Sequence, residues 1–429
     1  MDFIKDKKNN DYYKDNPILF VGFAVPQYLM NEIIILEKRQ PQIAAHKLQW
    51  NIINGIEENI GHGIDLLSSV PVSDFPNYPK IMFGLNYWSH RGDVQDFYIP
   101  FINLTILKHI SRFISAFMMI SFWLLRHKRH KNNLLIIIYG MHSPHVVAAI
   151  LGRWLFGGKI FLIVPDLPEF MDNGINRNVL RKFIKPLDCA ILRKTAKKMN
   201  GLITLTKHIA NDLAAQTVPY LVVEGAVSID MLESGSHQVN NLSINATDKG
   251  ERIIFYAGGL SSEYGVKILL DAFSLLPCHN YRLWLCGSGK MESAVKNAAM
   301  RDHRIIYWGV KTNSEVIQLE KHSTILINPR PSNNEFTKYS FPSKLLEFMA
   351  SGRPVITTPL KGIPDDYESY VNILEDQSPA GLARLIENLF NRTDDELSNF
   401  GERAKQFVIS QKNYHKQGLR IVEFIKCNS

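Results

Sequence analysis

The pattern that most constrains this chain is a repeated alternation of short apolar runs with longer stretches of helical periodicity. Residues 134–139 and 159–164 are two such runs, and the helical stretch 146–156 separates them. Short apolar runs bounded by turn residues are typical of strands buried on both faces, as in parallel sheets. Strands that alternate with helices indicate the crossover units of a doubly wound sheet. We therefore predict an α/β protein.

A second round of the same alternation follows a polar segment. Residues 252–257 form another apolar run that ends in two glycines, and residues 266–275 have helical periodicity. Residues 234–249, between the two halves, are rich in Ser and Asn, which is typical of a linker. A length of 429 residues suits two or three domains. We predict two Rossmann-like domains, over residues 1–233 and 251–405, with a linker at 234–250.

The composition is that of an ordinary globular protein, with 45% hydrophobic and 21% charged residues. A net charge of +8 and a pI near 9.1 favour an anionic partner such as phosphate, nucleic acid or a lipid surface. The 4 cysteines have no C-x-x-C or repeated spacing, so we expect reduced thiols in the cytoplasm. The polar segment Met1–Asn16 lacks the features of a secretory signal peptide.

Several well-known motifs are missing from the sequence. It has no G-x-x-x-x-G-K-[ST] loop and no G-x-S-x-G elbow, which argues against P-loop NTPases and serine hydrolases of the elbow type. The short motif at 287–289 lacks the third glycine and downstream acid of a dinucleotide site. No His, Cys and Asp cluster has metal-ligand spacing. We therefore expect neither a cofactor nor a metal ion.

Two polar residues follow consecutive strands of the first half. His142 comes after the run 134–139, and Asp166 comes after 159–164. Because ligands gather at the carboxyl ends of parallel strands, both side chains are candidates for acid–base catalysis or for orienting a hydroxyl group. The alternative is that His142 caps the next helix and Asp166 holds a turn.

The segment 339–356 reads as a loop, a helix and a strand. Ser340 is the expected N-cap, with Pro342 in the first turn and Gly352 at the end. Lys344 and Glu347 are three residues apart and share a helix face. A helix N-terminus with a lysine suits a phosphate, and Glu347 can accept hydrogen bonds from sugar hydroxyls. The alternative is a capped surface helix with an incidental ion pair.

Residues 113–125 are almost wholly apolar, and a basic run follows at 126–131. Such a segment is too short to span a bilayer, which takes about 20 residues. Two interpretations stay open. It is a buried helix of the domain, or an interfacial helix whose basic flank contacts an anionic membrane.

Four motifs of the second half, in this order, resemble those of glycosyltransferase family 4. They are Tyr-Ala-Gly-Gly-Leu at 256–260, Cys-Gly-Ser-Gly at 286–289, Tyr-Trp-Gly-Val at 307–310, and the segment 339–356. The first half is similar more loosely, through Asp-Leu-Pro-Glu at 166–169. The resemblance implies a GT-B fold, in which an N-terminal acceptor-binding domain and a C-terminal nucleotide-sugar-binding domain face each other across a cleft. It also implies hinge closure around the linker and a C-terminal helix, at 406–429, that packs back on the N-terminal domain.

The resemblance assigns donor contacts in the second domain. Glu347 matches the second acid of the family's Glu-x7-Glu motif, which holds the ribose hydroxyls of the donor. Tyr339 stands in place of the first acid and carries no charge, so contacts to the transferred sugar are expected to differ. The predicted donor-binding residues are Gly258, Gly259, Gly287, Val310, Arg330, Tyr339, Ser340, Phe341, Pro342, Ser343, Lys344 and Glu347.

The cations that often hold the diphosphate in this family are replaced. Gly259 and Tyr264 stand where members often have an arginine and a lysine. Arg330 and Lys344 are therefore expected to supply the positive charge, together with a helix N-terminus and without a metal ion.

In the first domain, the resemblance places a His or an Asp against the donor sugar, and both His142 and Asp166 fit by position. A retaining transfer lets the leaving phosphate accept the proton, so His142 is better described as a sugar contact than as a base. Gly22 and Glu169 are assigned to the acceptor side.

The implied activity is that of a retaining hexosyl- or N-acetylhexosaminyl-type glycosyltransferase that uses a UDP-sugar in preference to a GDP-sugar. The expected acceptor is a glycan or lipid-linked oligosaccharide in capsule, exopolysaccharide or O-antigen biosynthesis, at the inner face of the cytoplasmic membrane. No nucleic-acid partner is expected. The alternatives are a nucleotide-sugar epimerase of the GT-B fold and a non-catalytic scaffold for polysaccharide assembly.

Overall fold

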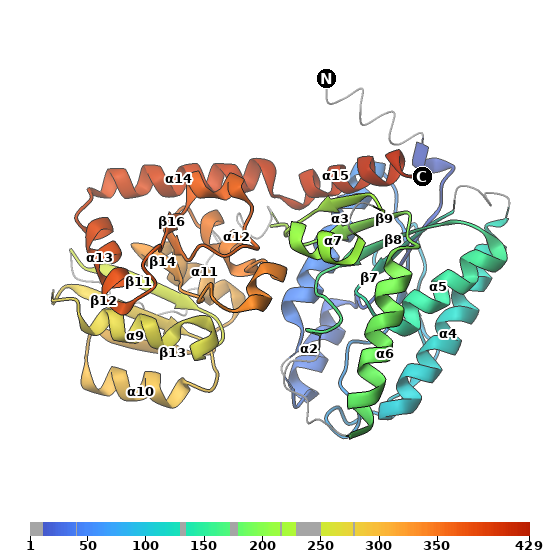
Figure 1. Cartoon of the computed structure of the whole chain (residues 1–429), viewed down its shortest axis with the longest axis horizontal. Helices are drawn as coiled ribbons and strands as arrows, with labels where there is room; N and C mark the ends of the chain where they lie inside the picture. The colour runs from blue at the N-terminus through green and yellow to red at the C-terminus, as the bar shows by residue number, and fades with distance from the viewer. Residues whose placement is uncertain are drawn as a thin grey trace. The chain divides into compact units, whose positions relative to one another are not determined.

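A computed structural model describes residues 12–39, 41–128, 134–171, 179–214, 217–228, 250–277 and 279–429. The chain divides into two compact units, and Figure 1 shows the elements of each. Unit 1 comprises Met1–Glu224 and Tyr414–Ser429, and unit 2 comprises Gly225–Asn413. Most of the predicted linker, from residue 234 to 249, lies outside the described residues.

Unit 1 is built on an eight-stranded sheet in the order β10-β9-β8-β7-β1-β2-β5-β4. Its strands pair in parallel except β4, which is antiparallel to β5. The strands are β1 (Ile18–Gly22), β2 (Asp65–Ser68), β4 (Tyr87–Trp88), β5 (Asp96–Tyr98), β7 (Leu135–Tyr139), β8 (Lys159–Val164), β9 (Gly201–Thr204) and β10 (Tyr220–Val222). A separate two-stranded sheet pairs β3 (Met82–Phe83) with β6 (Phe101–Ile102).

The helices of unit 1 include the crossover connections of the large sheet. They are α2 (Gln27–Leu36), α3 (Ile43–Ile60), α4 (Thr105–Arg126), α5 (Ser143–Phe156), α6 (Val179–Ala196), α7 (Lys207–Ala214) and α15 (Tyr414–Cys427). Helix α4 covers the predicted apolar segment and begins well before it.

Helix α15 belongs to unit 1 although it follows unit 2 in the sequence, and it packs on α3 (Figure 1). The two helices approach so closely that a Cβ on Gly55 would lie 2.2 Å from the carbonyl oxygen of Tyr414. Asn59 Nδ2 donates to the carbonyl of His415 at 2.8 Å, and the Tyr13 hydroxyl donates to that of Val422 at 2.7 Å. The C-terminal helix is thus part of the core of unit 1.

Unit 2 contains a six-stranded parallel sheet in the order β13-β12-β11-β14-β15-β16. Alternate residues of β11 enter cores on opposite faces: Ile254 and Tyr256 join one cluster, and Ile253 and Phe255 join the other. This two-sided burial explains the continuous apolar runs of the sequence. The strands are β11 (Arg252–Ala257), β12 (Tyr281–Cys286), β13 (Ile305–Gly309), β14 (Ile325–Asn328), β15 (Val355–Thr357) and β16 (Asn372–Ile373).

The helices of unit 2 are α9 (Val266–Ser274), α10 (Glu292–Arg301), α11 (Asn313–His322), α12 (Ser343–Ala350), α13 (Pro379–Phe390) and α14 (Asp394–Gln411). Short 3-10 helices are η2 (Ser262–Tyr264), η3 (Glu335–Tyr339) and η4 (Asp365–Tyr370). One detail of the prediction is wrong: the N-cap of α12 is Pro342, and Ser340 instead follows η3. The reason is that η3 extends to Tyr339, so the chain needs three more residues before α12 begins.

Candidate functional site

The carboxyl ends of β11, β12 and β13 meet through glycines. The amide of Gly258 donates to the carbonyl of Cys286 at 3.1 Å, and that of Gly287 donates to the carbonyl of Gly309 at 2.8 Å. Gly287 has φ +127°, and a Cβ on it would lie 1.9 Å from the carbonyl oxygen of Gly258. Only glycine fits such an approach, so this edge of the sheet is formed largely by backbone atoms. Gly259 continues it by accepting a hydrogen bond from the Tyr256 hydroxyl at 2.8 Å.

The segment Ser340–Ser343 leads from η3 into α12. Phe341 is buried, and its ring lies 5.5 Å from that of Tyr367, which anchors the segment in the core. No side chain caps the N-terminus of α12. The first turn of this helix therefore keeps backbone donors and the positive end of the helix dipole, which favour an anion.

Lys344 and Glu347 lie together on α12, with Nζ and Oε2 2.5 Å apart, and about a third of each side chain is exposed. Burial opposes the charge on the lysine, but the carboxylates of Glu347 and Glu320 outweigh it and raise the pKa of Lys344. The lysine is therefore a cation at neutral pH. This pair presents one positive and one negative group beside the helix N-terminus.

Arg330 follows β14 and is buried among the aromatic residues of two neighbouring segments. Its guanidinium lies 4.7 Å from the ring centroid of Phe336 and 5.6 Å from that of Tyr264. Its Nη1 donates to the Ser340 hydroxyl at 3.4 Å. The structure thus brings Arg330 to the segment that leads into α12, as the sequence-based assignment to a shared donor site requires.

The remaining donor-side candidates lie at the margin of this region. Tyr339 ends η3, and the ammonium of Lys338 lies 4.8 Å over its ring. Lys338 also pairs with the exposed Glu335 at 2.8 Å. Val310 follows β13 and is exposed.

In unit 1, His142 lies at the topological switch point of the sheet. The chain runs from β1 to β2 on one side, and β7 lies on the other side of β1. Ligands of doubly wound sheets bind at the carboxyl ends of the strands where the order reverses. His142 follows β7 there, and its ring lies 5.2 Å from Phe23, which follows β1. The geometry therefore places His142 where this fold class binds ligands.

His142 is surrounded by other nitrogen-bearing side chains. Its ring centroid lies 4.7 Å from that of His145 and 5.8 Å from that of His109 on α4. Burial, His145 and Arg112 lower the pKa of His142 well below its ordinary value, so the imidazole is neutral at pH 7. His142 directly precedes α5, but its side chain makes no capping hydrogen bond. His142 is thus the N-cap residue of α5 by position, but its side chain does not cap the helix.

The other candidates of unit 1 have different surroundings. Asp166 is exposed just after β8. Glu169 pairs with Arg193 on α6 at 2.7 Å, and Arg193 also pairs with Asp212 at 2.7 Å, so Glu169 is part of a surface ion-pair network. Gly22 ends β1, and a Cβ on it would lie 2.8 Å from the Gln49 side-chain oxygen. Glycine is required there by packing.

Two basic residues near His142 were not predicted. Lys108 and Arg112 of α4 are buried, although charged side chains rarely are. Lys108 donates to the carbonyl of Val72 at 2.6 Å and to Asp74 at 3.0 Å, and burial together with Arg112 lowers the pKa of Lys108 to about 8. Arg112 donates to the carbonyl of Val70 at 2.8 Å. Their spacing of four residues was the available signal, because it puts both on one helix face.

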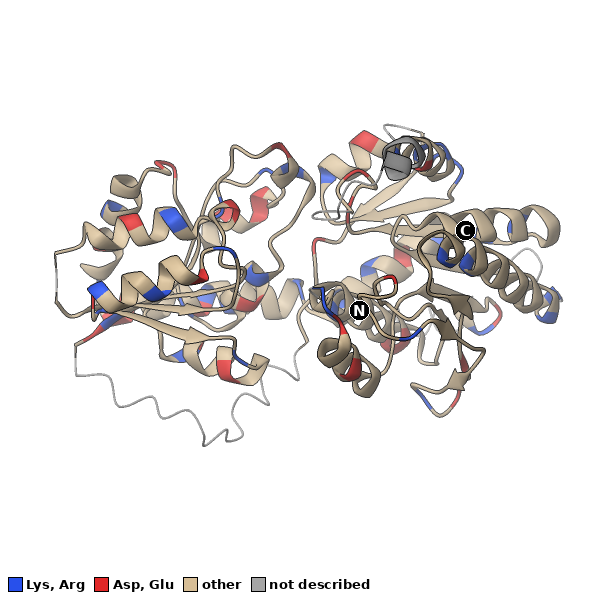
Figure 2. Ribbon diagram, turned by 90° about the horizontal axis from the view of Figure 1, so that it is seen from below, with Lys and Arg blue, Asp and Glu red and all other residues tan. Residues whose placement is uncertain are grey.

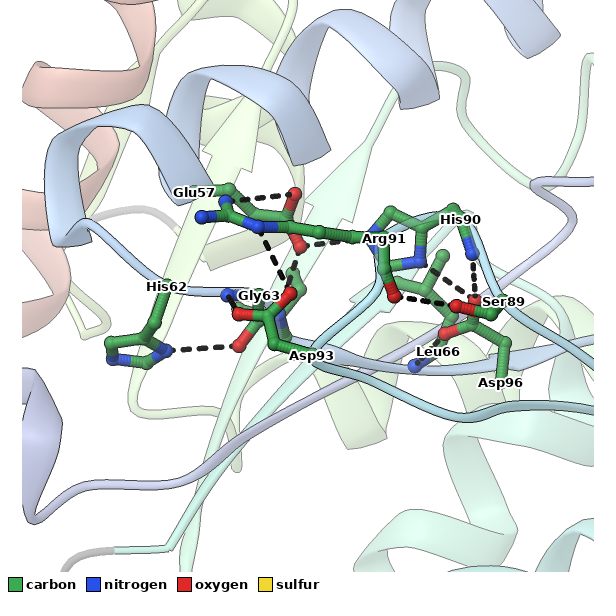
Figure 3. Close-up of polar contacts among 10 residues, drawn as sticks. Glu57, His62, Gly63, Leu66, Ser89, His90, Arg91, Asp93 and Asp96 are labelled. Atoms are coloured by element: carbon green, nitrogen blue, oxygen red, sulfur yellow. Dashed lines mark hydrogen bonds and ion pairs between the residues drawn. The ribbon is translucent and has the colours of Figure 1, made fainter.

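A second unpredicted cluster joins α3 to the β4–β5 hairpin (Figure 3). His90 Nε2 contacts Glu57 at 2.8 Å, and its Nδ1 contacts Asp96 at 2.7 Å. Burial favours the neutral ring, but the hydrogen bonds to Asp96 and Glu57 outweigh it and raise the pKa of His90 to about 9. Both ring nitrogens therefore donate at neutral pH, and the imidazolium fastens the hairpin to the helix. Among the described residues, no group of three or more His, Cys, Asp or Glu is arranged to hold a metal ion.

Comparisons with known proteins bear on both units. Residues 239–407 match the family model described as glycosyl transferases group 1. The putative teichuronic acid biosynthesis glycosyltransferase TuaH of Bacillus subtilis is 24% identical over 217 residues, which are 50% of this chain and 54% of that protein. This chain thus matches about half the length of that curated relative.

Solved structures of similar fold cover nearly the whole chain. Sucrose-phosphate synthase of Thermosynechococcus elongatus has a TM-score of 0.64 at 13% identity, over 96% of this chain and 98% of that one. Anabaena HepE in complex with UDP has a TM-score of 0.60 at 12% identity, over 96% of this chain and 100% of that one. The predicted GT-B fold and the resemblance to glycosyltransferases are confirmed. This chain therefore has the GT-B fold, and its residues 239–407 match the family model of glycosyl transferases group 1.

Proposed function

We propose that this protein is a glycosyltransferase that moves a sugar from a nucleotide-sugar donor to a saccharide acceptor. The observation that carries the proposal is the arrangement around α12. An uncapped helix N-terminus, Lys344 paired with Glu347, and Arg330 beside Ser340 all belong to the segment that matches the family.

The charge of each group suggests which part of the donor it binds. The first turn of α12, Lys344 and Arg330 stabilise the diphosphate as it leaves, and Glu347 accepts hydrogen bonds from the ribose hydroxyls. These groups provide the positive charge without a metal ion. We favour a UDP-sugar over a GDP-sugar, and the UDP complex of HepE, a structure of similar fold, supports this choice.

We assign the N-terminal sugar contacts to His142 and Asp166. The neutral imidazole of His142 can donate or accept a hydrogen bond with a sugar hydroxyl, and its position at the switch point supports that role. The transfer is proposed to retain anomeric configuration, with the leaving phosphate as proton acceptor, so these residues orient the sugar.

The proposed acceptor is a glycan or a lipid-linked saccharide of cell-surface polysaccharide biosynthesis. The printed role of TuaH in teichuronic acid biosynthesis supports this class of acceptor. The proposed transferred sugar is a hexosyl or N-acetylhexosaminyl group, and the candidate products are capsule, exopolysaccharide and O-antigen. We place the protein at the inner face of the cytoplasmic membrane, where lipid-linked acceptors are available.

The test is a donor panel. Purified protein is incubated with UDP- and GDP-sugars, with and without lipid-linked acceptors, and nucleotide release and sugar transfer are followed with and without EDTA. We expect acceptor-dependent release that EDTA does not reduce. Donor interconversion without an acceptor would instead identify an epimerase, and absence of binding to any nucleotide would leave a non-catalytic scaffold.

The variant His142→Ala tests the proposed sugar contact separately from the proposed nucleotide contacts. We expect this variant to bind the free nucleotide like the wild type and to transfer sugar more slowly, because His142 is assigned to the sugar and not to the nucleotide. Weaker binding of UDP alone would contradict that assignment.

A further inference from the structure

Helix α4 exposes apolar side chains along one face. Ile106, Ile110, Ile114, Met118 and Phe122 recur every four residues, and they are 54%, 50%, 50%, 64% and 68% exposed. Residues four apart lie above one another on a helix, so these five form a stripe along most of α4. Helices at the surface of a globular protein normally turn polar residues to the solvent.

The opposite face of α4 holds the charges that an exposed face would be expected to carry. Lys108 and Arg112 are only 5% and 4% exposed, and they lie on the inward side with Ala116 and Ile120. Burying a lysine and an arginine is unfavourable unless both are well paired. The tertiary fold nevertheless turns these residues inward and leaves the apolar stripe outside. The arrangement is the reverse of an ordinary surface helix and indicates that the stripe faces something other than water.

Helix α5 packs on α4 (Figure 1) and also exposes a large apolar side chain. Gly152 lets the helices approach, since a Cβ there would lie 3.2 Å from side-chain atoms of Ile120 and Leu124. Near the C-terminal end of α5, Trp154 is 79% exposed. We call the five stripe residues of this packed helix pair, namely Ile106, Ile110, Ile114, Met118 and Phe122, the α4–α5 face.

The charged residues of α4 and α5 themselves are all basic. These two helices contain no Asp or Glu, but they carry Lys108, Arg112, Arg126 and Arg153 (Lys and Arg are blue and Asp and Glu are red in Figure 2). Arg126 and Lys128 are exposed at the C-terminal end of α4. An apolar stripe with Phe, on a helix that has basic residues at its end and no acids of its own, is typical of helices that lie in the interface of an anionic bilayer.

A second copy of the chain suits the face less well. A two-fold contact through it would bring the same surface of both copies together. The basic flanks would then face each other with no acidic residue from either α4 or α5 to compensate, which is unfavourable. Charge complementarity therefore favours anionic lipid over a second subunit.

We propose that the α4–α5 face docks this protein on an anionic membrane surface, with α4 lying in the plane of the interface. At 22 residues α4 is about 33 Å long, and none of the described helices is long and apolar enough to cross a bilayer. Docking would hold the α4 end that carries His109 against the lipid, and His109 lies 5.8 Å from His142. In this respect the inference rests on the proposed function, because a lipid-linked acceptor would then meet the strand end that carries His142.

Vesicle flotation of the full chain tests the proposal. The vesicles are phosphatidylcholine alone and phosphatidylcholine mixed with phosphatidylglycerol. We expect the wild type to float with the anionic vesicles. The double variant Met118→Asp, Phe122→Asp should bind them with an affinity lower by a factor of at least about ten, because both side chains leave water on docking. The matched control is Leu275→Asp, Met300→Asp, which changes two residues of unit 2 that are 56% and 82% exposed.

A second double variant tests how much the basic residues contribute to vesicle binding. Arg126→Glu, Lys128→Glu should reduce binding to the anionic vesicles and leave any weak binding to pure phosphatidylcholine unchanged. Three results would overturn the proposal. They are no flotation of the wild type, equal flotation of Met118→Asp, Phe122→Asp, and a dimer in sedimentation velocity that this double variant dissociates.

Nucleotide binding measured on the same proteins keeps the two proposals apart. We expect Met118→Asp, Phe122→Asp to bind UDP or GDP like the wild type, because both residues lie in unit 1 and the proposed donor residues lie in unit 2. A wild type that floats but binds no nucleotide would remove the proposed function and leave membrane docking standing. A wild type that transfers sugar but never floats would remove membrane docking and leave the proposed function standing.

Discussion

At the scale of single residues, neighbouring groups decide whether a titratable side chain carries charge. Lys344 is held as a cation by Glu347 and Glu320, whereas burial keeps His142 neutral. The side chain of His90 is also buried, but its ring stays protonated because two carboxylates accept hydrogen bonds from its N–H groups. Burial alone therefore does not predict the charge of a histidine in this protein.

Glu347→Ala should weaken binding of the donor nucleotide by about 1.5–3 kcal/mol, because charged hydrogen bonds to the ribose are lost. Isothermal titration with UDP and GDP measures the change. The matched control is Glu402→Ala, which removes a similar acid from an ion pair with Lys405, also three residues apart, on α14. Unchanged affinity in a folded Glu347→Ala protein would remove this residue from the donor site.

His90→Gln should lower the stability of unit 1 by an amount that depends on pH. The pKa of His90 is raised from 6.5 to about 9, so its contribution is complete below pH 6.5 and is lost as the pH rises through 9. A shift of this size corresponds to at most about 3 kcal/mol. Urea unfolding of wild type and variant at several pH values measures it. A stability difference that does not shrink between pH 7 and pH 9 would contradict this explanation.

At the scale of elements, the contact of α3 with α15 shows how two helices far apart in sequence form one layer. Gly55 and Gly418 face each other, and a Cβ on Gly418 would lie 2.2 Å from the carbonyl carbon of Gly55. The backbones touch at this crossing, so no larger side chain fits there. Helix α4 makes a different contact: it packs on the unit with Lys108 and Arg112 inward and its apolar stripe outward.

Gly55→Ala should therefore destabilise unit 1 by about 1–3 kcal/mol, since the added methyl group overpacks the crossing. The control is Gly84→Ala, because a Cβ on Gly84 has nothing within 4 Å. Urea unfolding followed by circular dichroism distinguishes them. Equal midpoints for the two variants would mean that α3 and α15 can separate at little cost.

At the scale of the whole molecule, the chain leaves unit 1, forms unit 2, and returns to finish unit 1 with α15. Ile421, Val422 and Ile425 of that helix are fully buried in the core of unit 1. Unit 1 is thus incomplete until the last residues of the chain have been added.

Removing residues 414–429 should leave unit 1 unable to form its native core. Burial of the three apolar side chains contributes about 5–9 kcal/mol, at about 1.5–3 kcal/mol each, which is comparable to the total stability of an ordinary domain. Dye binding to exposed apolar surface and limited proteolysis measure the effect, and deletion of residues 428–429 alone is the control. A truncated protein with native cooperativity in unit 1 would contradict this account.

The sequence alone determined the fold class and the local geometry of α12. Continuous apolar runs predict strands of a parallel sheet without knowledge of any contact, because a strand that is buried on both faces has apolar residues at nearly every position. Glu347 and Lys344 were predictable since their pairing is local and follows from helix geometry. The sequence also predicted that glycines 258, 259 and 287 follow strands. It did not predict that the backbones of Gly258 and Gly287 approach each other closely.

Only the tertiary structure decided the orientation of α4 and the meeting of distant polar groups. The segment 113–125 is apolar on nearly every side, so its periodicity does not say which face packs inward. Glu57, His90 and Asp96 come from separate elements, and no local pattern predicts that they meet (Figure 3). Local sequence determines what each segment can become, whereas packing of the whole unit decides which of its faces is buried and which charges it must pair.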